Sequence, residues 1–273
     1  MIKKNLLGHQ EDHRLFLAVN WLKNSKLIKK NSEFSVNIAS SDASFRRYFR
    51  INITESTKTF ILMDSPPDKE PISQFVIVNK ILAELGVNSP KIYDKNLENG
   101  FLLLEDFGKL TYQEIISTKT KLNNILINDA INSLIKIQKW GIQNKEKLRS
   151  IPIYTKKKLN DELYLFIDWY LIKHLNFSIK NFQTNKFNQN VEILCKSALL
   201  ENQVFVHRDF HSRNLMYLAG KNNPGILDFQ DAVIGPQTYD LASLLRDAYT
   251  DFDRDFENYW LKYFWTKTTE NHI

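Results

Sequence analysis

The chain has 273 residues, of which 43% are hydrophobic and 25% charged, so it suits a folded protein and excludes a disordered one. Its single cysteine, Cys195, excludes an intramolecular disulfide and any multi-cysteine metal site. The net charge of +6 comes from basic residues spread along the sequence, so we expect no nucleic-acid partner. No apolar run reaches membrane-spanning length and the N-terminus lacks the core of a signal peptide, so we expect a cytoplasmic protein without a membrane contact.

The first hundred residues combine two helices with strands. Apolar side chains at helical spacing predict helices over residues 11–23 and 72–85, the second ended by Gly86. Alternating or short apolar segments predict strands of one antiparallel sheet over residues 34–38, 48–53 and 60–63. Residues 100–104 predict a further buried strand.

After Gly108 the pattern is mainly helical. Helices are predicted over residues 122–140, 159–175, 191–200 and from 237 to near the end of the chain. Strand signals return only at residues 204–206, 215–218 and 225–227. The sequence therefore predicts an α+β fold with two lobes, a small antiparallel-sheet lobe over residues 1–108 and a larger, mainly helical lobe over 109–273. A short hinge at 105–108 would join them, with ligands bound between the lobes.

The strongest functional signal lies at residues 207–214, His-Arg-Asp-Phe-His-Ser-Arg-Asn. Asp209 and Asn214 have the spacing of the catalytic loop of kinases. Phosphoryl transfer needs a carboxylate that accepts a hydrogen bond from the attacking hydroxyl group. A neutral amide oxygen can hold magnesium from the same loop without adding negative charge.

A second carboxylate follows at the end of a short apolar strand, in Asp228-Phe229-Gln230-Asp231. This segment is similar to the Asp-Phe-Gly metal site of kinases. The loop, the strand, the turn and the second strand-end aspartate occur in the expected order, which makes the signal far stronger than either motif alone.

These motifs, together with residues 235–247, resemble the aminoglycoside phosphotransferase and choline kinase superfamily. Residues 41–50, 63–67, 100–108 and 206–209 look closer to its branch of bacterial anomeric kinases of N-acetylmuramate and N-acetylglucosamine. The resemblance covers about residues 10–265. It implies a protein-kinase-like bilobal fold, ATP and magnesium, and phosphorylation of a small-molecule amino sugar in peptidoglycan recycling. We also expect a monomer.

The resemblance implies roles for single residues. Asp209 matches the catalytic base, and Asn214 and Asp228 match the magnesium ligands. Nucleotide contacts are implied for the hinge, whose backbone would meet adenine, and for the phosphate loop: Leu104, Glu105, Asp106, Phe107, Ser40, Ser41, Ser44 and Arg46. Substrate contacts are expected at four further positions: Trp169, His211, Arg213 and Asp231. Arg213 either contacts a substrate anion or phosphate, or holds Asp209 in place.

Two features depart from the family pattern. The phosphate loop has no glycine, so either its serine hydroxyls and backbone N–H groups face the phosphates or it is a plain hairpin turn. Met63 stands roughly where a phosphate-binding lysine is expected, so another cation or magnesium alone must neutralise the phosphates. Strand alternation puts Arg46 and Arg50 on one sheet face and Arg47 on the other.

Other residues have structural interpretations. His207 is expected to brace the loop, because an aspartate already fills the base position. Asp240 is expected to cap a helix and to brace the catalytic loop. The aromatic stripe of Trp169, Tyr170 and His174 is more typical of a helix core than of a cleft.

Two other functions compete with the sugar kinase. A kinase for a cationic substrate, such as an aminoglycoside or an amino alcohol, would use the acidic run at 251–257, which is otherwise a solvated helix face. A nucleotide-binding pseudokinase is supported only by the missing lysine. The chain also ends sooner after Trp265 than this branch usually does, so we expect part of the helical wall around the sugar to be absent.

Overall fold

The computed structural model describes residues 12–25, 27–28, 32–40, 45–54, 56–116, 122–178, 182–220 and 223–273. They form two compact units. Unit 1 takes its described residues from Met1–Leu110 and Met216–Gln230, and unit 2 from Thr111–Leu215 and Asp231–Ile273. Among these residues, no helix combines the length and the apolar character that crossing a bilayer requires.

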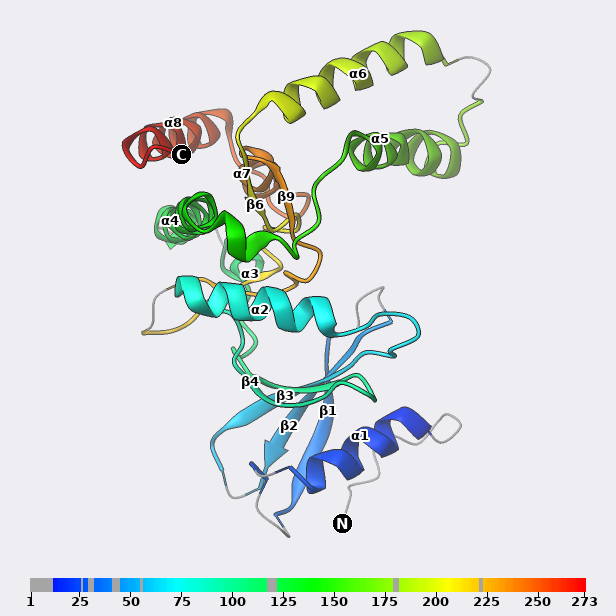
Figure 1. The fold of residues 1–273 in the computed structure, drawn as a ribbon, viewed down its shortest axis with the longest axis vertical. Coiled ribbons are helices and arrows are strands. Elements are labelled where there is room, and N and C mark those ends of the chain that lie inside the picture. The colour runs from blue at the N-terminus through cyan, green and yellow to red at the C-terminus, as the bar shows by residue number, and fades with distance from the viewer. Residues whose placement is uncertain are drawn as a thin grey trace. The chain divides into compact units, whose positions relative to one another are not determined.

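A five-stranded antiparallel sheet forms the centre of unit 1 (Figure 1). Its order is β1-β2-β3-β5-β4, where the strands span Phe34–Ser40, Arg47–Ile53, Thr59–Asp64, Phe101–Glu105 and Ile92–Asn96. The strands predicted at 34–38, 48–53, 60–63 and 100–104 are confirmed. Strand β4 was not predicted, because its side chains are at most partly buried and therefore carry no clear apolar alternation.

Two helices cover the sheet of unit 1 from opposite sides (Figure 1). Helix α1 (His13–Lys23) buries Ala18 and Leu22 in a cluster with Phe49, Leu62 and other side chains of one sheet face. Helix α2 (Ser73–Leu85) ends at Gly86, which adopts a left-handed φ of 74° that glycine reaches without strain. Both helices lie where the sequence predicts them.

Unit 2 is built mainly from helices. They are α3 (Tyr112–Ile116), α4 (Leu122–Gln143), a short 3₁₀-helix η1 (Lys145–Leu148), α5 (Lys156–Leu165), a π-helix η2 (Phe166–His174), α6 (Thr184–Leu200), α7 (Tyr239–Leu245) and α8 (Arg254–Glu270). Strand β6 (Gln203–Val206) pairs antiparallel with β9 (Val233–Pro236). Strands β7 (Leu215–Met216) and β8 (Gly225–Ile226) form a separate two-stranded ladder at the point where the chain passes from unit 2 to unit 1.

The structure corrects three helix boundaries. The helix expected from Leu159 begins earlier, at Lys156, because the side chain of Thr155 caps it by accepting a hydrogen bond from the Lys158 amide. After Leu165 the helix continues as a π-helix. Helix α6 begins at Thr184 rather than at 191. The C-terminal region contains two helices, the second begun by the Asp253 cap. For α5 and α8 the boundary depends on a side-chain cap or on local winding, which apolar periodicity does not record.

Candidate active site

The loop that carries Asp209 leaves the buried end of β6. His207 is fully buried, and its Nδ1 atom accepts a hydrogen bond from the backbone amide of Asp209 at 3.2 Å. This contact supports the bracing role expected for His207. Asn214 closes the loop from the other side, because its Nδ2 atom donates to the backbone carbonyl of Asp209 at 3.0 Å. The structure therefore brings Asp209 and Asn214 together, and the amide oxygen of Asn214 is the atom left to bind a cation.

Two carboxylates outside the loop hold its backbone. Asp240, on α7, is fully buried and accepts from the amides of His207 at 2.7 Å and Arg208 at 2.9 Å, which confirms the predicted brace. Burial raises the pKa of Asp240 to about 7, helped by the charge of Asp209 and opposed by the two amides. Asp247 accepts from the Ser212 amide at 2.8 Å. No role was predicted for Asp247 from the sequence.

The expected substrate residues of unit 2 occupy varied environments. The His211 ring lies 5.3 Å from that of Tyr249, and the Arg213 guanidinium lies 4.8 Å from the same ring. Asp231 is exposed. Trp169 is 59% exposed on the π-helix, with the Lys173 ammonium 3.5 Å from its ring centre, so the expectation that this aromatic stripe is core is wrong.

The hinge of unit 1 is organised by the side chain of Asp106, which is only 2% exposed. It accepts hydrogen bonds from Arg50 Nε at 2.6 Å, Thr59 Oγ1 at 2.6 Å and the Gly108 amide at 2.9 Å. Burial alone would raise the pKa of Asp106, but these donors and the Arg50 charge lower it overall. The Asp106 carboxylate is thus used within the hinge. Leu104 and Glu105 belong to β5, where Leu104 is buried.

A close contact links the hinge to the strand before Asp228. A Cβ atom at Gly225 would lie 2.7 Å from the ring of Phe107, so only glycine allows this approach. Phe229 is fully buried and packs 4.7 Å from Phe75 of α2, whereas Asp228 is exposed. The chain turns between them through a left-handed φ of 59° at Asp228, a strained conformation of the kind that clusters at functional sites.

Asp228 of unit 1 and Asn214 of unit 2 each carry a donor atom of a kind that magnesium binds. One Asp228 oxygen accepts from Gln230 Nε2 at 2.7 Å, which leaves the other carboxylate oxygen for a cation. A carboxylate and an amide oxygen are hard donors, unlike the imidazole and thiolate sets of zinc. The described residues contain no group of three or more metal-binding side chains, and a magnesium ion bound with nucleotide phosphates needs only one or two protein carboxylates.

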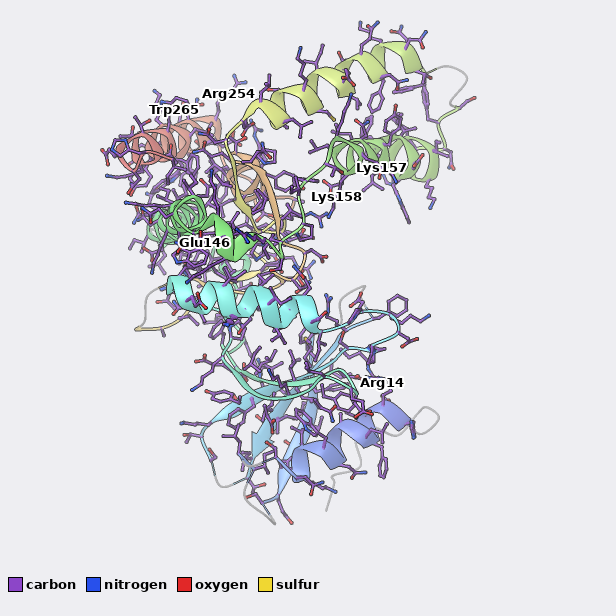
Figure 2. The ribbon with its side chains drawn as sticks, viewed as in Figure 1. Arg14, Glu146, Lys157, Lys158, Arg254 and Trp265 are labelled. Atoms are coloured by element: carbon purple, nitrogen blue, oxygen red, sulfur yellow. The ribbon has the colours of Figure 1, made fainter. Side chains whose placement is uncertain are left out.

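The arginines after the phosphate loop all have carboxylate partners. Arg46 lies 3.3 Å from Glu70, and Arg50 binds Asp106. Arg47 and Arg14 both bind the fully buried Asp64, each with an N–O distance of 2.5 Å (Figure 2 labels Arg14). Ser40 ends β1, opposite Tyr48. The expected contacts of Ser41 and Ser44 lie outside the described residues, and that of Arg46 stays a prediction.

Met63 and the acidic run can also be placed. Met63 is fully buried between Tyr48 of β2 and Leu102 of β5. In the acidic run, Asp253 caps α8, Glu257 is buried and pairs with Arg246 at 2.9 Å, and Asp251 and Asp255 are exposed. The carboxylates of the run thus serve separate purposes.

The model of the phosphotransferase enzyme family matches residues 35–268. The chain belongs to this family. Among curated family relatives, it is 40% identical to the N-acetylmuramate/N-acetylglucosamine kinase of Pseudomonas aeruginosa over 85% of this chain and 65% of that protein. It is 35% identical to the kinase of the same name from Neisseria meningitidis, over 87% of this chain and 68% of that protein.

Solved structures of similar fold include an ADP-bound aminoglycoside phosphotransferase, with a TM-score of 0.62 and 18% identity over 93% of this chain and 83% of that one. The choline kinase LicA of Streptococcus pneumoniae matches with a TM-score of 0.62 and 14% identity over 90% of this chain and 79% of that one. These similarities confirm the predicted kinase-like α+β fold. The chain spans 65% of the length of the Pseudomonas kinase that it matches.

Proposed function

We propose that the chain carries an ATP-dependent kinase activity that phosphorylates the anomeric C1 hydroxyl group of N-acetylmuramate, N-acetylglucosamine or both, in peptidoglycan recycling. The observation that carries this proposal is the catalytic loop, in which Asp209 is fixed from both sides by His207 and Asn214. The substrate class is supported by relatives of that name at 35–40% identity. The split of the acidic run gives no support to a pocket for a cationic substrate.

Each part of the chain has a role in this proposal. Residues 1–108 would form the nucleotide lobe, where the backbone of 104–107 would bind adenine, and residues 109–273 the catalytic and substrate lobe, of which the segment Met216–Gln230 groups with unit 1. Asp228 and Asn214 would hold magnesium, which when bound neutralises charge on the phosphates. Asp209 accepts a hydrogen bond from the substrate hydroxyl group and takes its proton late, since the transition state of phosphoryl transfer is loose.

An anomeric hydroxyl suits this site because it is more acidic than an ordinary alcohol. Asp209 then needs only to orient the hydroxyl and receive the proton, so catalysis depends mostly on positioning. Contacts to the N-acetyl group would provide part of that positioning. His211, Arg213, Asp231 and Trp169 are the candidates for substrate contacts.

ADP release over a panel of N-acetylated amino sugars, aminoglycosides and choline tests the substrate class. We expect turnover with N-acetylmuramate or N-acetylglucosamine, ATP and magnesium, and none with the cationic compounds. The product should be an acid-labile sugar 1-phosphate whose phosphorus couples to the anomeric proton in NMR spectra. The matched control is the methyl glycoside of the same sugar, which should bind without reacting. A stable 6-phosphate, or a phosphorylated methyl glycoside, would refute the anomeric assignment.

A further inference from the structure

Helix α5 brings a carboxylate to the catalytic loop. Glu162 Oε1 accepts a hydrogen bond from Arg208 Nη2 at 2.6 Å, although the two residues are 46 positions apart. Its other oxygen accepts from the hydroxyl of Tyr239, at 3.2 Å, and from that of Tyr154. The Glu162 and Arg208 side chains are 26% and 20% exposed. Three donors therefore fix Glu162 in one orientation, with Arg208 as its only charged partner among the described residues.

Arg208 has a strained backbone immediately before the proposed base. Its φ is 79°, in the left-handed region that residues with a Cβ atom avoid. Such a conformation persists only where the surroundings hold it. The backbone of Arg208 is held by Asp240, and its side chain by Glu162. A turn of the backbone at Arg208 would redirect Asp209, the next residue.

Two cationic side chains, those of Lys158 and Arg208, lie against the ring of Tyr154. Figure 2 labels Lys158 on the first turn of α5, and both the Lys158 ammonium and the Arg208 guanidinium lie 5.8 Å from the Tyr154 ring. Burial and the Arg208 charge lower the pKa of Lys158, and Asp231 opposes them. Arg208 Nε is buried without a hydrogen-bond partner in the described structure. Since no other carboxylate bonds to the Arg208 side chain there, its position depends on Glu162.

We propose that Glu162 is a positioning residue for phosphoryl transfer: through Arg208 it holds the catalytic loop in the left-handed conformation that sets the direction of Asp209. This inference rests on the proposed kinase function. Glu162 acts on Asp209 through Arg208, so it orients the base without touching the reacting atoms. No local pattern indicates this link, because Glu162 lies in an ordinary helical stretch far from the motif.

The test is a double-mutant cycle of Glu162→Gln and Arg208→Gly. Glu162→Gln keeps the shape of the side chain and removes its charge, so we expect kcat to fall about 10-fold while KM for ATP and for sugar changes less than about twofold. Glycine adopts a left-handed φ without strain, so the loop of Arg208→Gly no longer needs the anchor. Adding Glu162→Gln to Arg208→Gly should then leave kcat unchanged.

Glu192→Gln is the matched control, because Glu192 pairs with Lys156 of α5 at 2.7 Å in an exposed ion pair away from the catalytic loop. It should leave kcat unchanged. An equal loss from Glu162→Gln in both backgrounds, an unchanged kcat, or a raised KM for sugar alone would overturn the proposal.

Amide hydrogen exchange over residues 207–214, measured without substrates, separates this inference from the proposed function. Exchange should rise in Glu162→Gln and not in Glu192→Gln. If the wild-type protein transfers no phosphate but shows this pattern, the proposed function fails while the link from Glu162 to the loop stands. Unchanged exchange in Glu162→Gln would refute the link itself.

Discussion

The hinge of unit 1 and the catalytic loop of unit 2 are each held by a buried aspartate, but the partners of the two aspartates differ. Asp106 pairs with a cation, Arg50, and also accepts from Thr59 and from a backbone amide. Asp240 accepts from two backbone amides, and in the described part of the chain no lysine or arginine side chain bonds to it. The pKa of Asp106 is accordingly lowered, whereas burial raises that of Asp240 to about 7.

The difference follows from what each segment must leave available. Under the proposed function the hinge would keep its backbone groups for a nucleotide, and a salt bridge between side chains stabilises the hinge without using those groups. A cation bound to Asp240 would then lie close to the proposed catalytic loop and would itself attract the phosphates of a bound nucleotide. Two backbone amides satisfy Asp240 without adding a charge, but they leave its ionisation costly.

The largest effect on activity is expected for Asp209, the proposed base, rather than for Asp106 and Asp240, which hold the backbone in place. Asp209→Asn keeps the shape of the residue and removes the charge that orients the hydroxyl. We expect kcat to fall by about two to four orders of magnitude with ATP binding intact. Steady-state kinetics and ATP titration measure the two quantities. If Asp209→Asn turned over substrate as fast as the wild-type protein, Asp209 would not be the base, and the pseudokinase interpretation would be favoured.

The second prediction concerns Asp240. Its pKa in the folded state, about 7, exceeds the ordinary value of 3.8, so the folded protein binds more protons between these pH values. The stability contribution of Asp240 therefore falls as pH rises from about 4 to about 7, by roughly 4 kcal/mol in total. Asp240→Asn should abolish this slope, although its amide can accept only one of the two backbone bonds. Urea unfolding of both proteins at pH 5 and pH 8 measures it, and equal slopes would contradict the assignment.

Met63→Lys tests whether the sheet of unit 1 can accommodate the phosphate-binding lysine that the family pattern expects near this position. Met63 is fully buried beside the Asp64 ion pairs, so a lysine there would be a buried charge without a built partner. We expect a loss of roughly 3 kcal/mol in unfolding free energy and no gain in turnover. Met63→Leu, similar in volume, is the control and should cost less than about 1.5 kcal/mol. A several-fold rise in kcat for Met63→Lys would show that the site still accepts the missing lysine.

The smallest effect is expected at the hinge. Asp106→Asn leaves Arg50, which is 16% exposed, without its anion, and we expect the weakened charged hydrogen bonds to cost about 2 kcal/mol and ATP binding to weaken. Because the pKa of Asp106 is lowered, its stabilisation is complete above pH 3.8 and is lost as pH falls further. The variant should lack that acid-dependent loss. Asp68→Asn, at an exposed pair with Lys69, is the control; an equal change in its urea midpoint would rule out a special role for the hinge pair.

Local patterns were enough to predict much of the fold. Strands β1, β2, β3 and β5 alternate or are wholly apolar, helices α1, α2 and α4 have clear apolar spacing, and each of these was predicted. Strand β4 and the π-helix η2 were missed, because β4 is partly buried on both sides and a π-helix keeps nearly helical spacing. The 207–214 motif predicted the loop proposed for catalysis, and His207, Asp209 and Asn214 do interact within these eight residues.

The family, most of the elements and the residues proposed for catalysis follow from patterns that are only a few residues long. Which side chains hold those residues in place became clear only in the folded chain. Glu162, Asp240 and Asp247 reach the catalytic loop from more than 30 positions away, and Arg50 reaches Asp106 across the sheet. A carboxylate gives no sign of its partner in the sequence, since charge, burial and hydrogen bonding arise only when distant segments pack together.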